Sequence, residues 1–241
     1  MKSLAQFFDH LKLMPIRWDI QRNDELSGTG EGVVYQAELA PPLWKAEVTI
    51  QPVRLTEAQA ISALVRGLGG ALEPFMFRDP YICGPRLDPA GIWIVGSTVT
   101  IGSVSGGRIS LSGLPQILDY QATANALSEW PEDEADRTAV SVSGVPAGNY
   151  QLSAGDKLQV SVSGGRTYFL EVSEDVTASG SSTPLFSVFP RLPASVVVGN
   201  AVTLYRPACP CVVVPGSFQA GTVSGNIVSG MGFSIVQKRG V

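Results

Sequence analysis

The sequence predicts a mainly β protein with one main α-helix, and three observations support that class. Short runs of alternating apolar and polar residues recur along most of the 241-residue chain. Its 26 glycines and 17 prolines supply turns for many short strands. Beyond the N-terminus, only residues 56–67 carry a convincing helical pattern. We therefore expect strands to build most of the core.

The central stretch, residues 43–80, predicts strand, helix and strand in succession. Residues 46–53 alternate as a half-buried strand does. Thr56, with Gln59 three residues later, has the spacing of a helix N-cap and its capping box. The apolar stripe behind it comprises Ile61, Leu64, Val65 and Leu68. We expect the helix to end at its glycines, because glycine tolerates the left-handed conformation of helix ends. These are Gly67, Gly69 and Gly70.

The segments before and just after this helix also carry patterns. Residues 1–13 predict a short amphipathic helix. Residues 16–20 predict a strand with Trp18 as a buried anchor, residues 23–32 a polar turn or loop, and residues 33–39 another strand. After the helix, the run Phe75-Met76-Phe77 predicts a strand that ends at Pro80.

A less regular region follows the central stretch. Residues 81–91 predict an irregular connection, residues 92–95 and 99–104 two short strands, and residues 103–112 a loop or weak hairpin that could face a partner. Between residues 119 and 137, five acidic residues surround Trp130: Glu129, Glu132, Asp133, Glu134 and Asp136. We favour a solvated loop over a cation site, because the acidic residues lack EF-hand spacing.

From Val140 onward the pattern predicts a compact β module. Its strands are expected at residues 157–162, 167–172, 185–189, 196–198 and 201–205. Short, regular spacing with glycine turns indicates a small barrel or a sandwich. Three further strands are expected after Pro207, at residues 211–214, 216–223 and 227–236.

Composition excludes several classes of function. The net charge is −4, and a protein that grips nucleic acid needs clustered Lys and Arg. No apolar run approaches the roughly 20 residues that cross a bilayer. The N-terminus lacks the pattern of a signal peptide. We therefore expect a soluble protein made in the cytoplasm.

Catalytic, cofactor and metal sites are not predicted. The three cysteines are an odd number, and we expect Cys83, Cys209 and Cys211 to be reduced and structural. The Cys209-Pro-Cys211 pair lacks the second ligand pair of a zinc site, and the only histidine is His10. No nucleophile motif accompanies His10, so we expect no enzyme activity.

Two parts of the chain resemble the distal tail proteins of siphophages. One is the strand–helix–strand that ends in FMFRDP. The other is the later module, which reads LSAGDKLQVSVSGGRTYFLEVSEDVTASG, then PLFSVFPRLP and VTLYRP. The resemblance implies a β-sandwich belt domain made of residues 1–113 and 207–241. It also implies an inserted OB-like or galectin-like β-barrel at residues 114–206, consistent with a change in composition near Leu114.

The resemblance also implies a function. A homo-oligomeric ring, expected to be a hexamer, would continue the tail tube and join the tube protein to the hub and tip proteins, and DNA would pass through it without specific binding. The protein would be made in the host cytoplasm and reside in the virion at the tail tip. We expect the central helix, its flanking strands and residues 227–236 to build the ring contacts. The alternative is a carbohydrate-binding or receptor-binding module, with Tyr168, Phe169 or Trp130 stacking on sugars.

Overall fold

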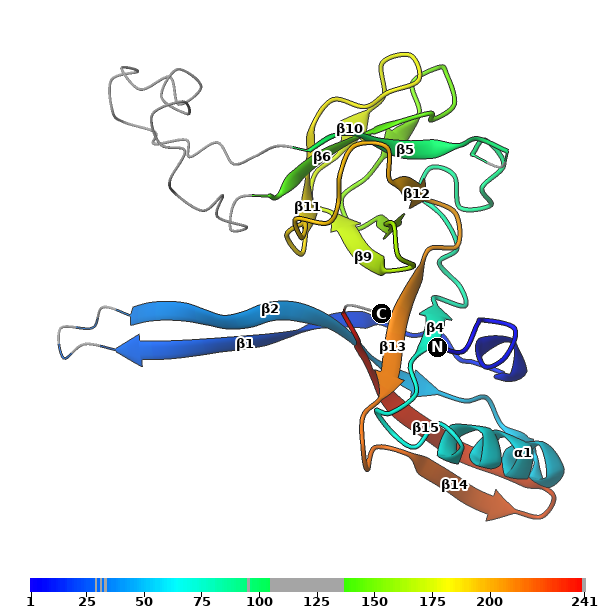
Figure 1. Ribbon diagram of the computed structural model, residues 1–241. Coiled ribbons are helices and arrows are strands. Elements are labelled where there is room, and N and C mark those ends of the chain that lie inside the picture. Colours follow the sequence, from blue (N-terminus) through cyan, green and yellow to red (C-terminus); the bar gives the residue numbers. More distant parts are fainter. Residues whose placement is uncertain (29, 31, 33, 95, 105–136, 240–241) are drawn as a thin grey trace.

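A sheet and a closed barrel make up the fold (Figure 1). The computed structural model describes residues 1–28, 30, 32, 34–94, 96–104 and 137–239. Among these residues there are 15 strands, one α-helix and one short 3-10 helix. The prediction of a mainly β protein with one main helix is therefore confirmed.

The sheet draws its seven strands from both ends of the described chain. They are β1 (Trp18–Gly28), β2 (Val34–Thr49), β3 (Val53–Arg54), β4 (Phe75–Arg78), β13 (Ala208–Val213), β14 (Gln219–Ser224) and β15 (Ile227–Gln237). β15 lies at the centre. Its first half pairs with β14 and β3, and its second half pairs with β2 and β13. Both ends of β15 are thus held on two sides by backbone hydrogen bonds.

The barrel closes from strands that lie between β4 and β13 in the sequence. Its order is β11-β6-β5-β12-β8-β9. The bounds are β5 (Val99–Val104), β6 (Ala139–Ser143), β8 (Lys157–Ser161), β9 (Thr167–Val172), β11 (Phe186–Phe189) and β12 (Ala201–Thr203), and β7 (Gln151–Leu152) pairs with β10 (Val176–Thr177) beside it. Of the two alternatives that the sequence left open, the barrel is the one observed.

The barrel takes in a strand that the sequence analysis assigned to the other unit. β5 pairs with β6 and β12, although it precedes the expected division at residue 114. Val99 and Ile101 alternate with polar residues as in any half-buried strand, so the pattern did not reveal which sheet they join. The division at residue 114 and residues 105–112 of the expected loop or hairpin lie outside the described residues.

The helix α1 (Leu55–Arg66) lies against β3, β14 and β15. It begins directly from β3, so the residue at the N-cap is Arg54 and not Thr56 as predicted. The Leu55 N–H is already bonded to the Asn226 carbonyl, 3.1 Å away, which fixes the helix start without a side-chain cap. At the other end Gly67 stays right-handed, and the left-handed residues are Gly69 and Gly70.

Several local predictions were wrong. The first 13 residues form only the 3-10 helix η1 (Phe8–His10), because Lys2 pairs with Phe75 of β4 and holds the start of the chain extended. Residues 23–28 continue β1, since a strand that faces water on both sides carries polar residues without penalty. The described residues of 92–95 form turns. Residues 196–198 are not a strand either; the Arg137 guanidinium donates to the Val196 carbonyl there.

The helical stripe generates a stability prediction. Ile61 and Val65 are buried in the sheet core, whereas Leu64 is only half-buried. Ile61→Ala should lower the free energy of unfolding by about 2–5 kcal/mol, because it leaves a cavity in a packed core. Leu64→Ala should cost less than half as much. Urea titrations of the two variants check this, and equal losses would contradict the observed burial.

The point where the chain leaves the sheet generates a second prediction. Arg78 at the end of β4 and Ala208 at the start of β13 are directly opposed cross-strand partners. Replacing residues 79–207 by a two-residue Asn-Gly turn should therefore preserve the sheet fold, because such turns join antiparallel neighbours. A matched deletion of residues 114–206 should aggregate, since it leaves β5 without its barrel partners. Circular dichroism and gel filtration decide between these outcomes.

Candidate functional site

Aromatic side chains join the barrel to the sheet. Phe169 of β9 packs against two tryptophans of the sheet, with ring centroids 5.2 Å from Trp18 and 5.7 Å from Trp44. The Trp44 indole N–H donates to the Phe169 carbonyl at 2.9 Å. Lys157 of β8 places its ammonium 4.2 Å from the Trp44 ring centroid and pairs with Glu171. We call these five residues the junction; they seat the barrel in one position on the sheet.

The Lys157 ammonium of the junction is partly buried away from water. Burial lowers the pKa of Lys157 to about 8, and the negative charges of Asp79 and Asp156 oppose that shift. The lysine therefore carries its charge at neutral pH, where the Trp44 ring attracts it. Trp18, predicted as a buried anchor, is partly buried, and its indole nitrogen has no hydrogen-bond partner among the described residues.

The connection between β4 and β5 carries exposed apolar side chains on a fixed backbone. We call this surface the connection patch; its members are Tyr81, Ile82, Leu87, Ile92 and Trp93, which are 49–75% exposed. Buried Asp88 accepts the N–H groups of Trp93 and Ile94, each at 3.2 Å. Asp156 of the barrel accepts the Arg86 N–H at 2.9 Å. Polar groups thus hold apolar residues out toward solvent.

A glycine is required in this connection. Gly91 has a φ of +67°, and a Cβ there would overlap the Tyr205 ring. The close approach ties the connection to the chain that leaves the barrel after β12.

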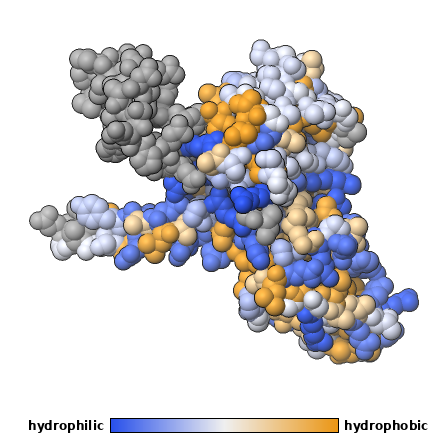
Figure 2. Space-filling model, in the orientation of Figure 1, coloured by the Kyte–Doolittle hydropathy of each residue, from blue (hydrophilic) through white to orange (hydrophobic). Residues whose placement is uncertain are grey.

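The second exposed surface is the outer part of the β1–β2 hairpin, which projects away from the rest of the molecule (Figure 1). We call its residues 21–28 and 34–40 the hairpin arm. Four large apolar side chains on it are 62–68% exposed: Leu26, Val34, Tyr35 and Leu39. In Figure 2 apolar atoms interrupt the hydrophilic surface of this arm. The arm differs from the prediction for residues 23–32, whose polar and glycine-rich sequence favours a turn or loop.

Only one end of the arm is anchored. Glu38 pairs with Arg191 of the barrel at 2.5 Å, and the Arg22 guanidinium lies 5.7 Å from the centre of the Phe189 ring. These contacts fix the direction in which the arm projects. Beyond them, neither face of the two-stranded ribbon is covered by other described residues.

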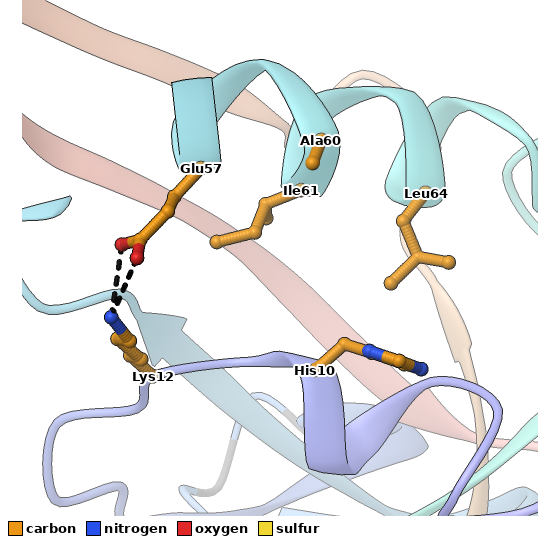
Figure 3. Close-up of a pocket in the computed structure, with 6 residues that line it drawn as sticks. All are labelled: His10, Lys12, Glu57, Ala60, Ile61 and Leu64. Atoms are coloured by element: carbon orange, nitrogen blue, oxygen red, sulfur yellow. Dashed lines mark hydrogen bonds and ion pairs between the residues drawn. The ribbon is translucent and has the colours of Figure 1, made fainter. Parts of the chain in front are cut away.

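A shallow cavity of about 350 Å³ lies between the N-terminal segment and α1. His10, Lys12 and Glu57 line it together with three apolar side chains of the helix (Figure 3). The Lys12 ammonium donates to both Glu57 carboxylate oxygens, at 2.9 and 3.0 Å, and this lowers the pKa of Glu57. The carboxylate is thus engaged as an ion, and the residues that line the cavity with it include no hydroxyl or thiol side chain.

The three cysteines are free thiols. Cys209 and Cys211 of β13 are buried in the sheet core, and Cys83 in the connection is partly exposed. Burial raises the pKa of the Cys209 thiol, and the neighbouring Cys211 adds to the shift.

Two of the three aromatic residues predicted to stack on sugars are buried. Tyr168 and Phe169 are buried, and the Tyr168 hydroxyl lies 2.8 Å from Ser195 Oγ. Both rings pack within the protein and cannot stack on a ligand. Trp130 and the acidic run from Glu129 to Asp136 lie outside the described residues.

The C-terminal segment expected at a ring contact is buried over its second half and exposed at its start. Residues 227–236 belong to β15, the central strand, and Ile235 within it is fully buried. A charge at Ile235 would unfold the sheet before it could disturb an interface, whereas Ile227 at the start of the segment is 52% exposed. The expected contact on α1 is more accessible, because Glu57, Ala60 and Leu64 are at least partly exposed.

Neither a metal cluster nor a membrane-spanning helix is present in the described part of the chain. No three His, Cys, Asp or Glu side chains within it gather closely enough to hold a metal ion. No helix in the same residues is long and apolar enough to cross a membrane.

No protein-family profile matches the sequence, and no curated protein matches it.

The burial of the thiols generates a third prediction. In the native protein, iodoacetamide should alkylate Cys83 and leave Cys209 and Cys211 unmodified, because alkylation needs an accessible thiolate. All three should react after unfolding in urea. Mass spectrometry of the peptides reads both results, and rapid labelling of Cys211 in the native state would contradict the burial of β13.

Proposed function

We propose that this chain is a structural virion protein of a long-tailed phage that forms a ring at the distal end of the tail tube. The ring, a hexamer on this proposal, connects the tube to the tail-tip or baseplate proteins and lets DNA pass through its lumen. The sheet with α1 acts as the belt, and the barrel is its OB-like insertion. The observation that carries the proposal is a sheet built from both chain ends around an intervening barrel.

That layout supports the proposal through the resemblance described above. The resemblance implies a belt whose halves flank a barrel in the sequence. Strands β1–β4 precede the barrel strands, strands β13–β15 follow them, and β15 unites the two sets. The motifs that carry the resemblance fall on α1 and β4 and on the barrel strands β8, β9 and β11.

The surfaces of the molecule give further support. The arm and the connection patch expose apolar area that a monomer leaves in water, and such patches mark interaction sites. Strand β14 pairs with β15 on one side only, so its other edge is open to a neighbour. A protein that assembles needs surfaces of this kind.

Charge is compatible with a channel for DNA. With a net charge of −4 the chain offers little attraction to phosphate, so DNA could move past it without being held. The alternative of a carbohydrate-binding module loses support, because Tyr168 and Phe169 are buried.

Imaging of tails tests the proposal. An antibody raised against the barrel should label purified tails of a phage that encodes this chain at one position, the junction of tube and tip. Averaged images should show a ring whose mass is six times the chain mass of 25.4 kDa. Absence of label from that junction, or label only on side fibres, would refute the proposal. Antibody absorbed with the purified protein serves as the control.

A further inference from the structure

The hairpin arm exposes large apolar side chains on both of its faces. Successive cross-strand pairs point to opposite faces of a ribbon. The pair Leu26–Gln36 therefore faces one side, and the pair Ser27–Tyr35 faces the other. Each face thus exposes a large apolar side chain, and a two-stranded hairpin alone is marginally stable in water. A partner that covers the arm would stabilise it.

The connection patch also exposes apolar side chains, but its backbone is held in place. Its apolar side chains project from a backbone that three buried or half-buried carboxylates hold by hydrogen bonds: Asp79, Asp88 and Asp156. Because the backbone is already ordered, a partner that binds here loses little conformational entropy in fixing it. The patch is therefore preorganised to receive an apolar ligand surface.

Each surface has one exposed ionic side chain without an ion pair among the described residues, and the two charges are opposite. On the arm, Asp24 pairs with Arg22 and Glu38 pairs with Arg191, whereas Glu25 forms no ion pair with another described residue. Beside the patch, exposed Arg206 donates its backbone N–H to the Cys83 carbonyl and stacks on Tyr205, again without an ion pair among the described residues. An acidic arm thus matches a patch with a free cation at its rim.

The two surfaces lie on opposite sides of the molecule. In Figure 1 the arm projects to the left, whereas the connection between β4 and β5 runs along the right. A copy cannot bring its own arm to its own patch. We infer that the hairpin arm of one copy docks on the connection patch of the next copy of this chain. This inference rests on the proposed ring, to which it assigns the two contact surfaces.

Such a contact is heterologous, because each copy gives one surface and receives on the other. Heterologous contacts close into a ring when the rotation between neighbours divides a full turn. Two contacts at the base of the arm contribute to that condition: Glu38 pairs with Arg191, and the Arg22 guanidinium lies over the Phe189 ring, so the direction of the arm is fixed.

Cross-linking between singly labelled copies tests the inference. Two full-length variants carry Cys83→Ser together with either Tyr35→Cys or Ile92→Cys, and the buried Cys209 and Cys211 are kept. An equal mixture treated with a short bis-maleimide should give a heterodimer linked through positions 35 and 92, identified by peptide mass spectrometry. The matched control replaces Ile92→Cys by Val198→Cys, which lies between β11 and β12, is 64% exposed and should give at least tenfold less product.

Charge exchange adds a second measurement. Glu25→Arg alone and Arg206→Glu alone should each lower the yield of the 35–92 product several-fold, and mixing the two charge variants should restore it. A yield no higher than the Val198→Cys control overturns the inference. Rings seen by microscopy without the 35–92 product overturn it too, while the proposed function survives. A 35–92 product confined to closed dimers retains the contact and refutes the ring.

Discussion

The pairing of β15 is the constraint on which the rest of the sheet depends. This strand lies near the C-terminus, yet its two edges pair with strands from both ends of the chain. Without it, β2 and β13 would have no common neighbour and α1 would lose the surface that buries Ile61. One glycine in the middle of β15 matters for the same reason. Gly232 allows β15 to approach the Val48 carbonyl of β2, where a Cβ would collide with that oxygen.

Sequence reasoning predicted the elements better than their partners. The short runs at Phe75-Met76-Phe77 and 167–172 reproduce β4 and β9, because an apolar run bounded by turn residues indicates a strand whatever that strand pairs with. The alternation at Val99 and Ile101 gave no information on whether β5 joined the sheet or the barrel. Long-range pairing decides that, and a single sequence does not record it.

The candidate surfaces were harder to predict for a related reason. Tyr35 and Leu39 read as one face of a strand, and a pattern of that kind normally indicates burial. Only the three-dimensional arrangement reveals that nothing within the described chain covers them. Tyr168 and Phe169 present the reverse case. Aromatic residues in a β module suit either a core or a ligand surface, and the junction with Trp44 commits Phe169 to the core.

The junction and the hydrogen bonds of the connection between β4 and β5 both hold the barrel on the sheet. Aromatic rings and a desolvated lysine position the barrel at the sheet, while the carboxylates of Asp88 and Asp156 fix the chain that links them. The sheet and the barrel are therefore held together by side chains as well as by the covalent links between them. On the proposed function, this arrangement would transmit a load from the tube to the tip without a flexible hinge.

Because Arg78 and Ala208 are cross-strand partners, the segment between them can be exchanged without disturbing the sheet. The chain leaves the sheet and returns to it at neighbouring points, so the sheet places almost no geometric demand on what lies between them. Recombination within residues 79–207 could exchange one module for another of different size in a single event. The ancestral sheet would keep its shape, and only the few junction contacts around Trp44 would need to adapt. Related genomes would then differ most in the middle of this gene and least at its two ends.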